Sequence, residues 1–519
     1  MSKINLSRRL HLIARHLREL LLFSMILVIG SIGIASAGGQ EAASTSKPDL
    51  IGIQRTGTSY TAVQVVSGTS GYTQQSLSQT TPLINSGSSN PSQWIFFMGD
   101  YDKDGIPDLI GVQRENTGTG YTEVHVLSGA SGYTQWLVNV ATPMGKTGSS
   151  TNGQWLYFLA DYNKDGVPDL IAINRENTGS GYTEIHVLSG ASGYTQWSLH
   201  AATPIAKSGS SNAGEWLFFM ADYDGDGIPD LIGVQRENTS SGNTEVYVLS
   251  GASGYTQWLL HATTPIAKSG SSNAGEWLFY VADYDGDGKP DLIGVQRENT
   301  GTGYTEVHVL SGASGYTTWL VNNATPIAKS GSSNAGQWLF YVADYNGDGK
   351  PDLIGVQREN TGTGYTEVHV LSGASGYTTW LVNTATPLAK SGSSNAGEFA
   401  FCVNYKCIPN QDAYNKLTVN ANNTTTANGT VTSSSVLANY ASSIRCSGAT
   451  CSAMFPIDDT VTLTETPSVY SSTFGGWSGA NTTNGNTCMV KMSTAKSVTA
   501  TFNLGFEKPL LDSAMGVAE

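Results

Sequence analysis

Short runs of apolar and β-branched residues recur along most of the chain, and clusters of Gly, Asn, Asp and Ser separate them. Residues 216–221, 231–235, 245–249 and 256–260 form one group of four such runs, each with the length and composition that favour a β-strand. The group returns every 61 residues, in phrases that open at Asp100, Asp161, Asp222, Asp283 and Asp344. The pattern predicts a repeat protein whose unit is a small four-stranded sheet.

Repeats of this size with four strands each are typical of β-propeller blades, which stack around an axis because one small sheet cannot bury both of its faces alone. The segment Pro-Asp-Leu-Ile opens the second strand and occurs six times, first at Pro48 and last at Pro351. The aromatic first strand is missing before Pro48, and a spare copy lies at 398–403. We therefore expect an all-β fold with a six-bladed propeller over 48–405, closed by strand exchange that removes exposed sheet edges. An open solenoid with truncated end blades is the alternative.

The first 37 residues differ from the repeats. Lys3 and four arginines precede an apolar run over 20–34, and Ala35-Ser36-Ala37 follows as a small-residue cleavage site. This order predicts an export signal for the general secretory route, followed by a linker over 38–47. An uncleaved N-terminal anchor is the alternative, because the apolar run is near the lower length limit of a spanning helix. We expect a secreted or cell-surface protein that is not inserted in a membrane once the signal is cleaved.

The charge balance narrows the range of partners. Acidic residues outnumber basic ones 41 to 27, whereas nucleic acids and anionic membranes favour clustered Lys and Arg. Removing the signal takes away five of the 27 basic residues and one of the 41 acidic residues, which leaves 22 and 40. We therefore expect no nucleic-acid partner, and the excess of acidic residues requires another explanation.

Many of the acidic residues lie in the loop between the first two strands of each unit. The loop reads Asp-x-[Asp/Asn]-x-Asp-Gly-x-Pro-Asp, with side-chain oxygens at positions 1, 3, 5 and 9, a backbone carbonyl at 7 and Gly at 6 for the sharp turn. A hard cation such as calcium needs this spacing, whereas magnesium demands a tighter octahedron. The expected side-chain ligands are Asp100, Asp102, Asp104 and Asp108; Asp161, Asn163, Asp165 and Asp169; Asp222, Asp224, Asp226 and Asp230; Asp283, Asp285, Asp287 and Asp291; and Asp344, Asn346, Asp348 and Asp352. Repulsion among these carboxylates also implies a cation, and about five calcium ions are expected. Solvated turns without metal are the alternative.

The loop at 222–231 and its four copies resemble the FG-GAP or VCBS repeat, the calcium-bearing blade also seen in integrin α-subunit propellers. Members of that family include adhesins, lectin-like modules and accessory domains of polysaccharide-active enzymes, so the resemblance implies extracellular binding by a calcium-stiffened ring. One departure concerns the last unit, whose loop would begin at Asn404, because Lys406 and Cys407 stand where ligands should be. No sixth calcium site is expected.

Other repeated residues have two interpretations each. An arginine follows the second strand in every full unit and could help to bracket a sugar or a peptide: Arg114, Arg175, Arg236, Arg297 and Arg358. Tyrosines lie at the end of the next loop (Tyr121, Tyr182, Tyr304 and Tyr365), and a tryptophan lies in the fourth strand (Trp136, Trp197, Trp258, Trp319 and Trp380). These residues either contact a ligand, or they pack and hydrogen-bond within the blades. If they bind, near-identical blades should give several weak sites.

The histidines do not form a singular catalytic group. His125, His186, His308 and His369 share one strand position, and His200 and His261 share another. An active site needs a singular constellation, and the sequence contains neither G-x-S-x-G nor H-E-x-x-H. We therefore expect a surface or secreted binding and adhesion module for a glycan or a protein, and no enzyme. A polysaccharide-active enzyme or its accessory domain, and a structural surface component, are the alternatives; the oligomeric state is left open.

A second, smaller β domain is expected over 416–503, between a linker at 406–415 and a tail at 504–519, because few acidic residues and alternating Thr-rich strands occur there. Its phrases at 444–451 and 474–479 resemble the divergent internalin-type B-repeat, or bacterial repeat, of secreted surface proteins. That resemblance implies a stalk or a ligand-presenting module.

The chain has five cysteines, and an exported protein would use them as disulfides. Cys446 with Cys451 is the expected short bridge. Cys402 with Cys407 is a possible clip that replaces the lost calcium loop. Cys488 is left over, and it is either buried and inert or paired between chains.

Overall fold

A computed structural model gives the fold of the chain. It describes residues 47–55, 59–84, 86, 93–148, 154–208, 215–269, 276–331, 337–391, 399–403, 406–407, 414–422, 429–435, 445–447, 450–456, 460–467, 472–491 and 496–504. The expected export signal at 1–37, Asn404 and nearly all of the expected tail lie outside these residues. Within the described residues no helix is long and apolar enough to cross a membrane.

Six antiparallel sheets form the blades, and within each sheet neighbouring strands follow one another in the chain, except in blade 1. Blade 2 contains β4 (Trp94–Gly99), β5 (Asp108–Gln113), β6 (Tyr121–Leu127) and β7 (Trp136–Gly145); blade 3 contains β8 (Trp155–Ala160), β9 (Asp169–Asn174), β10 (Tyr182–Leu188) and β11 (Trp197–Ala206). Blade 4 contains β12 (Trp216–Ala221), β13 (Asp230–Gln235), β14 (Asn243–Leu249) and β15 (Trp258–Ala267); blade 5 contains β16 (Trp277–Ala282), β17 (Asp291–Gln296), β18 (Tyr304–Leu310) and β19 (Trp319–Ala328). Blade 6 contains β20 (Trp338–Ala343), β21 (Asp352–Gln357), β22 (Tyr365–Leu371), the short 3-10 helix η5 (Gly373–Ser375) and β23 (Trp380–Ala389).

The burial of each strand follows from its sequence. The second strand of a blade, such as β5, is apolar at nearly every position and is buried on both faces, because a neighbouring blade packs on each side. The fourth strand, such as β7, alternates exposed and buried residues along its second half. It also runs for ten residues, so in blade 4 it extends to Ala267, beyond the expected end at residue 260.

Blade 1 combines both ends of the repeat region. It contains β24 (Phe399–Val403), β1 (Leu50–Gln54), β2 (Tyr60–Val66) and β3 (Gln75–Ile84), and β25 (Lys406–Cys407) adds a short fifth strand beside β24. β24 pairs antiparallel with β1, from Leu50 opposite Val403 to Gln54 opposite Phe399. The strand exchange and the six blades expected from the sequence are therefore confirmed. β25 lies where a linker was expected.

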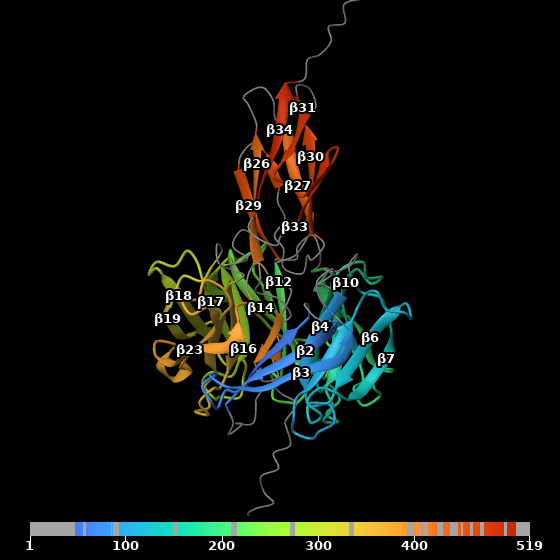
Figure 1. The fold of residues 1–519 in the computed structure, drawn as a ribbon, viewed down its shortest axis with the longest axis vertical. Helices are drawn as coiled ribbons and strands as arrows, with labels where there is room; N and C mark the ends of the chain where they lie inside the picture. Colours follow the sequence, from blue (N-terminus) through green and yellow to red (C-terminus); the bar gives the residue numbers. More distant parts are fainter. Residues whose placement is uncertain are drawn as a thin grey trace, which may run out of the picture.

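A tyrosine connects each of blades 2 to 6 to the blade that follows it, and the last of these bonds closes the ring. The Tyr101 hydroxyl of blade 2 donates to the carbonyl oxygen of Gly190 in blade 3 at 3.1 Å. The same bond joins Tyr345 of blade 6 to Gly68 of blade 1 at 3.0 Å. Leu50 and Val66 share a buried apolar cluster with blade 6 residues such as Ile354, so the interface between the first and last blades is packed like the others. Figure 1 shows the blades, from blue to orange, arranged around this ring.

The remaining strands form a separate unit of two sheets, drawn in orange and red beyond the ring in Figure 1. They are β26 (Tyr414–Asn422), β27 (Gly429–Ser435), β28 (Arg445–Ser447), β29 (Thr450–Pro456), β30 (Thr460–Pro467), β31 (Ser472–Ser478), β32 (Thr482–Asn484), β33 (Thr487–Lys491) and β34 (Lys496–Leu504). β26 pairs in parallel with β34, and side chains such as Leu417, Leu463 and Phe502 form the core of the unit.

The cysteines agree with an oxidised chain. Cys402 and Cys446 each take part in a disulfide. Cys407 is the register partner of Cys402 between β24 and β25. The side chains of Cys407 and Cys451 lie outside what the structure describes, so the two expected pairings stay predictions. Cys488 is a buried free thiol, which agrees with the first of its two interpretations.

Candidate metal centres

The five acidic loops join the first and second strands of blades 2 to 6, and they share one backbone conformation. In blade 2 the first aspartate, Asp100, accepts a hydrogen bond from the N–H of Gly105 at 3.0 Å. Gly105 has φ 83°, where a residue with a side chain would be strained, so glycine at position 6 allows the turn that brings the oxygens together. The third aspartate, Asp104, accepts from the N–H of Ile106 at 2.7 Å.

The aspartate at position 9 is the buried member of each set. Asp108 is fully buried; its Oδ2 accepts from the N–H of Tyr101 and its Oδ1 from the N–H of Gly129, both at 2.8 Å. Burial raises its pKa to about 6, although the backbone donors act in the opposite direction. The same cause raises the pKa of Asp169, Asp230 and Asp352 to about 6 and that of Asp291 to about 7. Each loop therefore holds a carboxylate that is costly to ionise without a cation.

Carboxylate oxygens converge in three of the loops. One oxygen from each of three aspartates lies within 4.8 Å of the others in the sets Asp100, Asp102 and Asp108; Asp222, Asp224 and Asp230; and Asp283, Asp285 and Asp291. The other two loops carry Asn163 or Asn346 at position 3, whose amide oxygen is also a suitable donor. The expected ligands at position 5, such as Asp104, are not part of these sets of three.

A further observation supports a hard cation at these loops. Asp100 Oδ1 is buried and has no hydrogen-bond partner among the described residues, so a bound cation would supply the missing interaction. All side-chain donors are oxygens, which suit calcium better than metals that prefer nitrogen or sulfur. The loops can therefore hold a metal ion through positions 1, 3 and 9.

Lysines connect successive loops around the ring. Lys103 Nζ donates to the carbonyl oxygen of Asp165 in the next blade, and Lys164 Nζ donates to that of Asp226. Farther along, Lys289 Nζ donates to the Tyr223 carbonyl of the preceding blade at 3.2 Å, and Lys350 Nζ to that of Tyr284 at 3.1 Å. One ammonium group thus lies at each of these four interfaces between acidic loops and partly offsets their charge. Sequence analysis missed this role, although its signal is that Lys occupies either position 4 or position 7.

The repeated arginines correct an expectation. The side chains expected to bracket a ligand are buried, with exposed fractions of 3% for Arg114, 2% for Arg236 and 0% for Arg175, Arg297 and Arg358. Arg175 donates to the carbonyl oxygen of Ser208 at 3.3 Å, and Arg236 to that of Ser269 at 3.4 Å. These arginines tie the loop after the second strand to the end of the blade. They are not available to a ligand at the surface.

The repeated tyrosines, in contrast, are exposed. The side chains at the start of the third strand are exposed by 46% to 49% in five blades: Tyr60, Tyr121, Tyr182, Tyr304 and Tyr365. Because the third strand runs in the same direction in every blade, its first residue lies on the same rim of the ring. Blade 4 has Asn243 at this position. Among the tryptophans of the fourth strand, Trp136 and Trp258 are the two that are more than one-third exposed.

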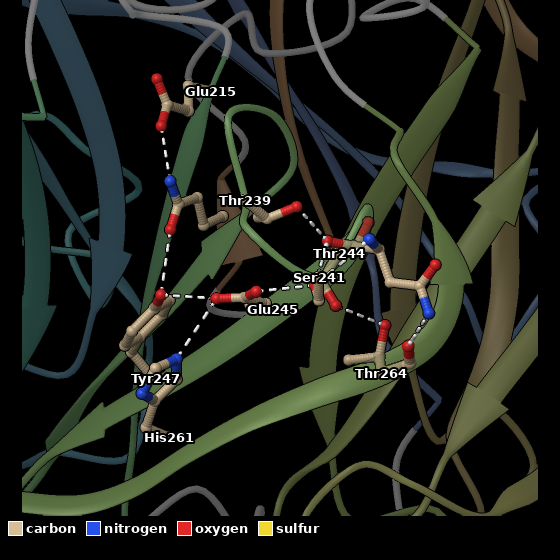
Figure 2. Close-up of polar contacts among 10 residues, drawn as sticks. Glu215, Thr239, Ser241, Thr244, Glu245, Tyr247, His261 and Thr264 are labelled. Atoms are coloured by element: carbon tan, nitrogen blue, oxygen red, sulfur yellow. Dashed lines mark hydrogen bonds and ion pairs between the residues drawn. The ribbon is translucent and has the colours of Figure 1, made fainter.

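Blade 4 has a polar network of its own, shown in Figure 2. Tyr247 occupies the strand position where four other blades have histidine, so the repeats are less uniform than the histidine pattern suggests. Its hydroxyl lies 2.7 Å from Glu245 Oε2 and 3.0 Å from Gln235 Oε1, and His261 Nε2 lies 3.2 Å from the same Glu245 oxygen. Ser241 donates to the other oxygen of Glu245. The network connects side chains of β13, β14 and β15 and so stabilises this blade.

Comparison with known protein families gives a match to the central repeats. A family model for the FG-GAP-like repeat matches residues 161–233 and 222–294. The two matched segments in the central blades are therefore similar to FG-GAP-like repeats. No curated protein matches the chain.

Solved structures with a similar arrangement of strands are distant. A Photorhabdus luminescens Tc holotoxin pore is 15% identical with a TM-score of 0.38, covering 82% of this chain and 17% of that one. An α-L-arabinofuranosidase from Fusarium graminearum is 14% identical with a TM-score of 0.34 (59% and 87%), and an exo-β-1,3-galactanase from Phanerochaete chrysosporium is 9% identical with a TM-score of 0.29 (79% and 93%). The chain thus spans less than a fifth of the toxin. Likenesses this weak assign no activity.

The buried aspartates predict a pH dependence for the metal-free protein. Their pKa values of about 6 to 7 exceed the value of 3.8 for an ordinary aspartate, so the folded state holds these protons more tightly than the unfolded chain. This stabilising contribution is complete below about pH 4 and is lost as the pH rises through about 6 to 7. After metal removal on a chelating resin, urea unfolding should therefore give a lower free energy of unfolding at pH 8 than at pH 5.

The calcium-saturated protein is the control for this measurement. A calcium ion held by these loops would require ionised carboxylates, so the loss of stability between pH 5 and pH 8 should disappear when calcium is bound. Equal unfolding free energies at the two pH values in the metal-free protein would contradict the prediction.

Proposed function

We propose that the protein is an exported, calcium-stabilised propeller that binds glycans through several equivalent weak sites, and that it is not an enzyme. The observation that carries the proposal is the set of exposed tyrosines on one rim of the ring. An exposed aromatic ring offers a flat apolar surface to the apolar face of a sugar. In blade 2, Thr119 donates to Glu123 at 2.7 Å next to Tyr121, so polar groups suited to sugar hydroxyls lie beside the ring.

Calcium is the ion that best fits the five acidic loops. The donors are carboxylate, amide and carbonyl oxygens on loops with a flexible glycine turn, and calcium accepts six to eight such ligands. The residues that would hold it in blade 5 are Asp283, Asp285 and Asp291, with Asp287 as the fourth expected side chain. The ion would stiffen the ring and hold the loops in position. About five ions per chain are proposed, one for each loop.

Export is proposed from the sequence of residues 1–37 and from the cysteines. Cys402 and Cys446 each take part in a disulfide, and disulfides persist outside the cytosol. FG-GAP-like repeats are typical of extracellular proteins, which agrees with this location. The two-sheet unit after the ring is proposed to act as a stalk that presents the propeller at the cell surface.

Multivalent binding is the expected result if this proposal is correct. A glycan array with the calcium-loaded mature chain should identify a ligand class, and calorimetry with a hit should give more than one equivalent per chain. Tyr304→Ala should weaken binding to an array surface only slightly, because four equivalent sites remain. Alanine at all five rim tyrosines should abolish binding.

The five-fold variant needs a stability control. The tyrosines are about half exposed, so their loss should change the melting temperature little, and a folded variant that does not bind isolates the rim as the site. Trp258→Ala serves as a matched control, since Trp258 is also exposed but lies in the fourth strand of blade 4, which lacks the rim tyrosine. A stoichiometry of one, lost on a single substitution, would overturn the proposal in favour of one unique site.

A further inference from the structure

Blade 3 brings two histidines together across its outer strand pair. His186 on β10 and His200 on β11 are register partners, and their Nδ1 atoms lie 2.6 Å apart. The corresponding partner in blades 2, 5 and 6 is an asparagine: Asn139, Asn322 and Asn383. In blade 4, His261 faces Tyr247. Among the described blades, the pair of imidazoles is therefore particular to blade 3.

The surroundings of His186 determine where its proton lies. Glu184 Oε2 is 3.6 Å from His186 Nε2, and a carboxylate on that side favours the tautomer with the proton on Nε2. Burial, together with the nearby His200, lowers the pKa of His186 to about 4, so the ring is neutral near pH 7. The lone pair on Nδ1 then points to His200, whose Nδ1–H donates to it. One hydrogen bond therefore joins the two Nδ1 atoms, both of which could bind a metal ion.

We propose that His186 and His200 form a binding site for one transition-metal ion of the Cu²⁺ or Zn²⁺ class, distinct from the acidic loops. The metal takes the place of the shared proton and bonds to both Nδ1 atoms. The displaced proton of His200 moves to its own Nε2, so no proton is lost overall. Water completes the coordination.

The geometry needs only a small adjustment. Two nitrogens that each bind a metal at about 2.1 Å lie roughly 3.0–3.4 Å apart, a few tenths of an ångström more than the present contact. His200 is exposed at the edge of the blade and can turn to provide this distance. Imidazole ligands favour Cu²⁺ and Zn²⁺ over calcium, whereas the aspartate loops favour calcium, so calcium should not compete for the pair.

Cu²⁺ is the sharpest probe, because it quenches nearby tryptophan fluorescence. The Trp197 ring lies 4.2 Å from the His200 ring, between centroids. An untagged, calcium-saturated full chain should show saturable quenching by Cu²⁺ with one equivalent, and electron paramagnetic resonance should show nitrogen ligands. His200→Asn restores the pair found in blades 2, 5 and 6 and should weaken this site by about tenfold or more, since one of two nitrogen ligands is lost. His261→Asn in blade 4 is the matched control and should leave the affinity unchanged.

A gain of function separates the site from an effect on folding. Asn139→His would place an imidazole opposite His125 in blade 2, where the same strand register holds, and should raise the stoichiometry from one Cu²⁺ to two. Absence of saturable quenching in the native chain, an unchanged affinity in His200→Asn, or a stoichiometry of one in Asn139→His would each overturn the proposal.

Discussion

A chain that ends before Glu398 should aggregate or lose its cooperative unfolding transition. Such a chain lacks β24, so β1 would present an unpaired edge, and the apolar side chains of Leu50 and Ile53 would lose their cover. Phe401, Cys402 and Val403 are buried in the intact ring, so their apolar contacts would be lost as well. Size-exclusion chromatography and thermal unfolding by circular dichroism measure both effects.

Two further variants separate ring closure from general damage. A chain that ends after residue 413 loses the two-sheet unit but keeps β24, and it should stay soluble with a cooperative transition. Phe401→Ala in the full chain should lower the free energy of unfolding by about 3–5 kcal/mol, because Phe401 fills the interface between the first and last blades. A soluble chain without β24 that melts at the temperature of the control would refute closure by strand exchange.

Removal of calcium should lower the melting temperature substantially. An ion that binds only the native state adds about 2.7 kcal/mol to the free energy of unfolding at a free concentration of 100 dissociation constants. Each of the five loops would make a contribution of this kind. The metal-free state also suffers repulsion among the carboxylates, which lie within 4.8 Å in three loops. Differential scanning calorimetry with calcium, and again after chelation with the metal content verified, measures the effect.

The repeats provide natural controls for this second experiment. Asp224→Asn gives the loop of blade 4 the donor set found in blades 3 and 6, so calcium binding should persist. Asp224→Ala removes the oxygen and should lose about one equivalent of bound calcium, measured by calorimetric titration. An unchanged melting temperature in verified metal-free protein would show that the loops are turns that do not depend on metal.

The repeat period, the four strands and the strand exchange could be predicted because each rests on local patterns of apolar residues. The acidic loops could be predicted because their ligand spacing lies within nine consecutive residues. The burial of the arginines could not be predicted, because a charged side chain next to a loop is usually exposed to solvent. The carbonyl that Arg175 contacts belongs to Ser208, a residue 33 positions later. Their burial becomes visible only when the blade is assembled.

The same limit applies to contacts between blades. The bonds from Tyr101 to Gly190 and from Lys103 to Asp165 depend on how one sheet packs on the next, which no window of sequence contains. Packing is the more common role for repeated tyrosines, whereas the exposure of the rim tyrosines favours binding. The sequence shows His186 and His200 as two separate repeat positions, and their contact could not be predicted because it depends on the strand register.

The pairing of β24 with β1 also sets an order of events during synthesis. β1 is among the first strands to leave the ribosome, and its partner at Phe399–Val403 follows only after five other blades have been made. Contacts between segments so distant in sequence form slowly, because a long loop must first be closed. The blades can assemble one after another, but the ring remains an open row of sheets until residue 403 is available. Pairing of β24 with β1 is therefore the last step in the folding of the propeller.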